Sequence, residues 1–218
     1  MADKFRQDLT RGSVTKQLMK FAIPFLLSNL LQALYSVADM IIVGRFSGDK
    51  GTICIIGVNI GSQINILVTG AALGLAVGGT VLIAQYGGAH KFDEQRKTIG
   101  TLFTLYMILA VIFTAVMLLL GTTLLDVLKT PQVAYTEAEN YYNICMAGLI
   151  FMFAYNVISA ILRGMGDSKR PLYFVLIATI VNVIGDIILV GPFNMGAAGA
   201  AYATVGAQAL SVILSLIY

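Results

Sequence analysis

Charged residues are scarce in this sequence of 218 residues. Only 11% are Asp, Glu, Lys or Arg, whereas 58% are hydrophobic, and the mean hydropathy is +0.85. This composition, in which the apolar residues form long runs, excludes a soluble globular protein and indicates a helical membrane protein. A transmembrane β-barrel is excluded as well, since its strands would alternate apolar and polar residues over segments of about 10 residues.

Cysteine and histidine are also rare. Cys54 and Cys145 lie in or beside apolar runs, with no metal-ligand spacing and no disulfide framework, so we interpret both as small apolar packing residues. The only histidine, His90, lies in a charged loop and is interpreted as solvated. The net charge of +3 does not indicate nucleic-acid binding, because the basic residues lie beside the ends of apolar runs.

The apolar runs predict an all-α membrane protein with a bundle of six transmembrane helices. About 20 residues at a rise of about 1.5 Å each cover the roughly 30 Å of bilayer hydrocarbon. Residues 1–20 are predicted to form an amphipathic lead on the cytoplasmic membrane surface, and residues 21–218 to form the transmembrane lobe. The predicted spans are about 21–43, 52–86, 98–121, 140–162, 172–190 and 197–218.

Small residues and proline refine this prediction. Gly70, Gly74 and Gly78 follow the small-xxx-small spacing, which predicts close packing of the second span against another helix. The stretch 196–206, rich in Gly and Ala, predicts the same for the sixth span. Pro24 is expected near the start of the first span, where a missing N–H costs little.

Basic residues predict the orientation. Eleven of the fourteen lie in the N-terminal lead and in the loops that follow the second and fourth spans, and three lie in the loops at the other end. The positive-inside rule therefore predicts a cytoplasmic N-terminus. Localisation in the cell (plasma) membrane as a multi-pass protein is the corresponding expectation.

Two carboxylates are predicted to lie inside the membrane. Asp39 is the only charge in the first span, and residues 39–46 resemble residues 186–193, so that Asp186 holds the same place in the fifth span. Both spans run outward in the predicted orientation, which places the two acids at one depth, about 7 Å below the outer end. The polar residues at 29, 32, 36 and 39 keep helical spacing and predict a single polar face.

Such acids are a functional hypothesis by default, because an acid at this depth costs roughly 2.5–3.5 kcal/mol in insertion free energy. Two close carboxylates titrate as a coupled unit and suit the uptake and release of protons or the binding of a small cation. The structural alternative is two acids satisfied by Asn, Tyr and backbone groups. A second alternative, an intramembrane aspartyl protease, uses a Gly-x-Gly-Asp sequence, whereas residues 183–186 read Val-Ile-Gly-Asp.

The order of several short motifs resembles the multidrug and toxic compound extrusion (MATE) transporter family. They are Ala38-Asp39-Met-Ile-Ile-Val-Gly44, Gly78-Gly79-Thr80 with Ala84-Gln85-Tyr86-Gly87-Gly88-Ala89, the turn from Leu162 to Pro171, Asn182-x-x-x-Asp186, and Gly196-Ala-Ala-Gly-Ala-Ala-Tyr-Ala-Thr204. The resemblance spans nearly the whole chain.

The resemblance implies an antiporter, not an enzyme, that exports amphiphilic and often cationic compounds in exchange for H⁺ or Na⁺, with no other cofactor. It implies the N-terminal six-helix lobe of a twelve-helix transporter, so the C-terminal lobe of the same parent chain is an expected partner, together with membrane lipid and the small-molecule substrate. By resemblance, the ion-coupling and substrate-binding residues are Asp39, Asp186, Asn182, Tyr35, Asn156 and Thr204, with Na⁺ held by Asp39, Asn182 and Asp186 as one option.

A lipid-linked precursor flippase of similar build is the other transport hypothesis. Flippases of this kind place basic residues in their cavity for a phosphate-bearing load, and no Lys or Arg lies within the predicted spans after Lys20. The sequence therefore favours the drug antiporter.

Overall fold

The structure is a computed structural model that describes residues 13–217; residues 1–12 and 218 lie outside the described part. Every regular element within this range is helical, as the apolar runs predicted. The long helices are α1 (Val14–Phe46), α2 (Gly51–Gly88), α3 (Phe92–Val127), α4 (Tyr135–Ala147), α5 (Leu149–Gly164), α6 (Lys169–Val190) and α7 (Gly196–Ile217). Two 3₁₀ turns, η2 (Gly48–Lys50) and η3 (Gln132–Ala134), lie between them.

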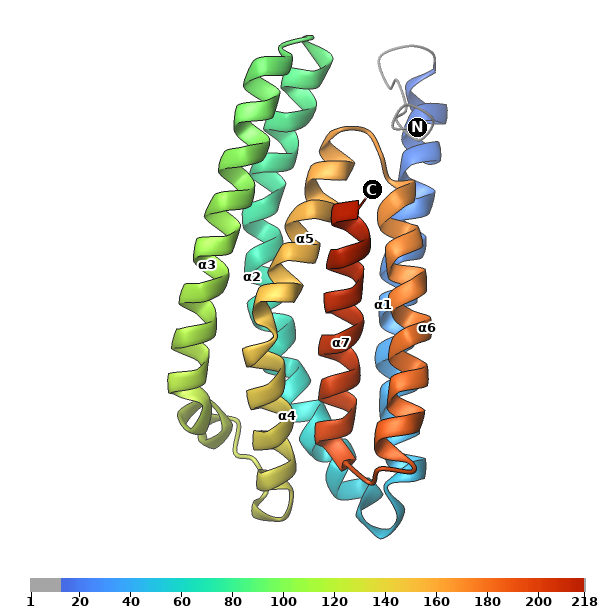
Figure 1. Cartoon of the computed structure of the whole chain (residues 1–218), viewed down its shortest axis with the longest axis vertical. Coiled ribbons are helices and arrows are strands. Elements are labelled where there is room, and N and C mark those ends of the chain that lie inside the picture. The colour runs from blue at the N-terminus through green and yellow to red at the C-terminus, as the bar shows by residue number, and fades with distance from the viewer. Residues whose placement is uncertain (1–12, 218) are drawn as a thin grey trace.

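The helices run up and down in one bundle (Figure 1). Within residues 13–217 five helices are long and apolar enough to cross a membrane, and the bent pair of α4 and α5 makes a sixth crossing. The predicted six-helix bundle is thereby confirmed. The start of α1, the α2–α3 turn, the α5–α6 turn and the end of α7 all lie at one end (Figure 1).

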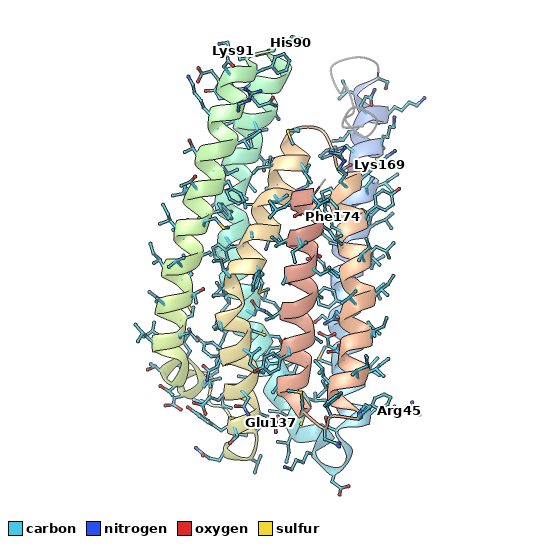
Figure 2. The ribbon with its side chains drawn as sticks, viewed as in Figure 1. Arg45, His90, Lys91, Glu137, Lys169 and Phe174 are labelled. Atoms are coloured by element: carbon cyan, nitrogen blue, oxygen red, sulfur yellow. The ribbon has the colours of Figure 1, made fainter. Side chains whose placement is uncertain are left out.

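We call this end the basic end, because it carries most of the basic residues. Lys91 and Lys169 lie there, whereas Arg45 and Glu137 mark the opposite end (Figure 2). The turn after α5 is ordered by the buried Asp167, whose Oδ1 accepts the backbone N–H groups of residues 169 and 170 at 3.1 Å each. These bonds satisfy two of the donors that the start of a helix leaves free, so the turn fixes where α6 begins.

The fourth predicted span is two helices instead of one. The axis bends by 51° at Gly148, between α4 and α5. A Cβ at Gly148 would lie 2.4 Å from Cγ2 of Val205 on α7, so the backbone of the two segments meets α7 where only glycine fits. The bend therefore lies at a close contact with a residue far along the chain.

Adding a methyl group at this contact is expected to destabilise the bundle. Gly148→Ala should lower the free energy of unfolding by about 1–3 kcal/mol, the usual cost of overpacking, because the β-branched Val205 has little freedom to move away. The midpoint of thermal unfolding of the purified protein in detergent measures this. The matched control is Gly100→Ala on α3, where a Cβ would meet nothing within 4 Å; equal midpoints for the two variants would contradict a tight contact at Gly148.

Helix α1 begins earlier than the predicted first span. Residues 14–20, assigned to the surface lead, continue the helix without a break, and residues 1–12 of the lead lie outside the described range. Pro24 therefore lies in the interior of the helix. The expected position near the start of the helix is wrong. In the interior Pro24 removes one intrahelical hydrogen bond, while Ser28 Oγ donates to the Pro24 carbonyl oxygen at 2.9 Å.

The two small-residue stretches have different outcomes. In α7 the stretch 196–206 is buried over most of its length, which confirms its use in tight packing. In α2 a Cβ at Gly70, Gly74 or Gly78 would meet nothing within 4 Å, so the predicted packing of this ridge is wrong for this lobe. A small-residue spacing gives the capacity for close approach but does not say whether a helix comes near.

Candidate functional site

The two membrane acids face each other between α1 and α6. Asp39 is 4% exposed and Asp186 is fully buried, at 0%. Their carboxyl groups are neighbours, which agrees with the predicted common depth, and α1 packs along α6. The helices end differently beyond the acids, since Gly44 lies inside α1, whereas Gly191 follows the last residue of α6.

Helix α7 completes this cluster from the third side. The side-chain amide of Asn182, one turn before Asp186, donates to Thr204 Oγ1 of α7 at 3.3 Å. Thr204 also lies beside the carboxyl group of Asp39. Gly185 allows this approach, since a Cβ there would lie 3.0 Å from the Cβ of Ala203. Three helices therefore bring Asp39, Asn182, Asp186 and Thr204 together; we call these four the acid cluster.

Most oxygens of the acid cluster have no donor. Asp39 Oδ1, both carboxyl oxygens of Asp186 and Asn182 Oδ1 are buried and make no hydrogen bond. A buried polar group without a partner costs about 1–3 kcal/mol, and more when it is charged. Two ionised carboxylates cannot satisfy each other, since neither has a proton to donate. The oxygens of the cluster therefore need a bound cation or a proton as a partner.

The arrangement suits a proton or a hard cation. One proton placed on either acid converts an acceptor into a donor to its neighbour and removes one negative charge. Two carboxylates, an amide oxygen and a hydroxyl also form the all-oxygen ligand set that hard cations prefer. No Lys, Arg or His belongs to this cluster, so no side chain within the described residues neutralises it.

The other two predicted residues lie differently. Tyr35, one turn before Asp39, is a near neighbour of that acid and lies beside Gln208 of α7. The Asn156 amide instead donates to the backbone oxygen of Met152 at 2.8 Å, within its own helix α5. The structure does not bring Asn156 to the acid cluster, and its role stays a prediction.

The inward face of α1 also differs from the predicted one. Asn29 and Ser36 are exposed, whereas the inward polar residues are Ser28, Gln32, Tyr35 and Asp39, which keep steps of four, three and four. The polar face is therefore rotated slightly around the helix from the set we had chosen.

A small cavity adjoins the acid cluster on its basic-end side. Its volume is about 20 Å³, which is room for about one water molecule. Asn182, Thr204, Tyr35 and Gln32, the last from the predicted polar face of the first span, line it together with polar residues that the sequence analysis did not select: Tyr155, Thr179, Gln208 and Ser211. Gln208 had a usable signal, because it lies four residues after Thr204 and therefore on the same face of an apolar helix.

Comparison with known proteins gives the family. The MatE family profile matches residues 24–188. The chain is 34% identical to the probable multidrug resistance protein YpnP of Bacillus subtilis (strain 168), over 97% of this chain and 47% of that protein. It is 31% identical to the probable multidrug resistance protein NorM of Thermotoga maritima, over 88% of this chain and 41% of the other.

Solved structures agree with these relatives. One described as an outward-facing conformation of a multidrug resistance MATE family transporter of the MOP superfamily superposes with a TM-score of 0.88 at 27% identity, over 97% of this chain and 46% of that one. The chain therefore spans about half the length of the proteins it matches.

These matches do not favour the protease alternative, since members of the matched family are transporters and not enzymes. They do not favour the flippase either, since the relatives are named as multidrug resistance proteins. They agree with the helical bundle and with the several apolar helices of a multi-pass membrane protein. The chain belongs to the MATE family of transporters and corresponds to one lobe of it.

Proposed function

We propose that this chain is the N-terminal lobe of a multidrug exporter that exchanges H⁺ or Na⁺ for amphiphilic, often cationic compounds, with the coupling ion bound at the acid cluster. The single observation that carries the proposal is the set of four buried acceptor oxygens without a donor. A proton shared by Asp39 and Asp186, or a cation held between them, would satisfy these oxygens.

The mechanism follows from the charge of the cluster. Binding a proton or Na⁺ between α1 and α6 removes net negative charge, which lets these helices repack and weakens the hold on a cationic substrate. The substrate leaves on the outer side, and the ion leaves toward the cytoplasm. Coupling requires that the ion bind the two conformations with different affinity.

The orientation and setting belong to the same proposal. The excess of Lys and Arg at the basic end supports a cytoplasmic N-terminus in the cell membrane. A C-terminal lobe as partner is supported by α2, where the polar Asn59 and Gln63 are exposed at membrane depth and the ridge of Gly70, Gly74 and Gly78 is bare. Exposed polar groups and small residues suit a protein or water surface better than lipid.

Efflux of ethidium from cells tests the exporter itself. Cells that express the full-length gene encoding this chain are expected to lose ethidium faster than cells with empty vector. Collapse of the proton and sodium gradients together should remove the difference, because the ion gradient supplies the free energy. Efflux equal to the vector control, with the protein present in the membrane, would overturn the proposed function.

A further inference from the structure

The cavity beside the acid cluster lies between the cluster and the basic end. Helices α1 and α6 start at the basic end, so Tyr35 and Thr179 precede their acids on that side. Helix α7 runs back toward the basic end, so Gln208 and Ser211 follow Thr204 in the same direction. Three helices therefore place polar cavity residues on one side of the cluster.

The cavity is suited to water. Asn182 is 2% exposed, lines the cavity and has an unpartnered Oδ1. Thr179 Oγ1, one turn before Asn182 on α6, and Gln208 Oε1 on α7 are buried and unpartnered as well. Buried polar atoms that have no protein partner are commonly bridged by water, and the volume fits about one molecule.

Helix α5 carries the polar line onward to the basic end. Tyr155 lines the cavity and is 5% exposed, and its hydroxyl donates to the Pro171 carbonyl oxygen, at the start of α6, at 3.3 Å. Ser159, one turn further, lies beside Tyr155 with its hydroxyl buried. Arg163 follows after another turn, near the end of α5, with its guanidinium 5.3 Å from the centre of the Phe25 ring.

Toward the opposite end, α1, α6 and α7 bury only apolar residues and glycine beyond the acid cluster: Ile42, Val43, Val190, Ala197, Gly199, Ala200, Ala201 and Ala203. An ion without polar partners is costly to bury among such residues. The polar groups on that side come from α4, where Tyr141 lies near Asp39 and Glu137 Oε2 accepts the backbone N–H of Ala197 at 3.1 Å. The cavity lined by polar side chains lies on the basic-end side of the acids.

We propose that the coupling ion moves between the acid cluster and the basic end through this cavity, inside the lobe, and that Tyr155 closes the path. In the closed state the tyrosine hydroxyl is held on Pro171, which ties α5 to the start of α6. When that bond opens and the ring turns aside, water connects the cavity to Ser159 and the basic end. The positive charge of Arg163 near the exit raises the barrier for cations and so limits leakage. This inference rests on the proposed function, which places a coupling ion at the acid cluster.

Chemical labelling of a cavity cysteine tests the path. In a variant with Cys54 and Cys145 replaced by alanine, Thr179→Cys is introduced and exposed to a small cationic methanethiosulfonate reagent. The reagent is added to inside-out vesicles, which present the predicted cytoplasmic side, and separately to intact cells. The measured quantity is the labelling rate of residue 179 with and without a change at Tyr155.

Tyr155→Phe is expected to raise the rate from the cytoplasmic side by about fivefold, a factor that the net strength of one hydrogen bond allows. Tyr155→Ala, which also removes the ring, should raise it further. Tyr202→Phe, an exposed tyrosine of α7, is the matched control and should leave the rate unchanged. The Phe variant keeps the packing of the ring, so a failure of the Ala variant to fold leaves the test intact.

Equal rates in all Tyr155 variants would overturn the path, as would a rise seen only when reagent is added from the cell exterior. Either result leaves the proposed function standing if gradient-driven efflux remains sensitive to the acids. Loss of efflux in liposomes or cells for every form of the protein would instead remove the proposed function and not only the path.

Discussion

Replacing Asp186 with asparagine is expected to reduce gradient-driven ethidium efflux strongly. The substitution keeps the shape of the side chain and removes its charge, at a residue that is fully buried and has two unpartnered oxygens. With one acid left, the cluster no longer changes its charge in the same way when the ion binds. The efflux rate should fall about 5- to 150-fold, the range that corresponds to a coupling free energy of about 1–3 kcal/mol.

The comparison needs a matched acid elsewhere. Asp49→Asn removes the same charge from the exposed η2 turn, and we expect normal efflux from it. Protein in the membrane fraction is quantified for each variant, and efflux is measured with and without collapse of the proton and sodium gradients. Unchanged efflux in Asp186→Asn would reduce the acid pair to a structural role and move ion coupling to the rest of the transporter.

The prediction that the two acids lie at one depth came from counting residues along the helices. Each span ends at a polar loop, so the depth of Asp39 and Asp186 follows from their distance to the end at a fixed rise per residue. The i,i+4 relation of Asn182 to Asp186 follows in the same way. Depth is therefore readable from sequence in a membrane protein, because the bilayer fixes the ends.

Rotation about the helix axis was harder to predict. Neighbouring residues on a helix differ by about 100° in direction, and Tyr155 points into the cavity while its neighbour Asn156 bonds to its own helix. An error of one residue on α5 thus replaces Tyr155, which lines the cavity, with Asn156, which does not. The same error on α1 selected Asn29 and Ser36, both exposed, instead of Ser28 and Tyr35.

Contacts distant in sequence account for the remaining differences. The bend at Gly148 lies inside an apolar stretch with no local break signal other than one glycine, at a close contact with Val205 on a different helix. The α2 ridge shows the converse case, since its spacing is typical of packed helices and no helix of this lobe lies against it. Local sequence gives a helix its possible contacts, and the rest of the bundle decides which of them form.

Sodium is expected to stabilise the purified protein, and protons to compete with it. At a pH where both acids are ionised, two adjacent carboxylates and the oxygen of Asn182 lack a partner, so a cation that fits between them binds the folded state and not the unfolded chain. Mass action then adds about 2.7 kcal/mol of stability at a Na⁺ concentration 100-fold above the dissociation constant. Thermal unfolding in detergent measures the rise of the midpoint, with choline chloride at equal ionic strength as the control.

The sign of the pH effect follows from competition for the same oxygens. Acidification places a proton on the pair, which removes the charge that attracts Na⁺, so more Na⁺ is needed for the same rise as the pH falls. Asp39→Asn and Asp186→Asn should each remove the Na⁺-specific rise, while Asp49→Asn should retain it. An equal midpoint in sodium and choline at every pH would contradict Na⁺ binding at the acid cluster. The proton, which binds to the same oxygens, would then remain as the proposed coupling ion.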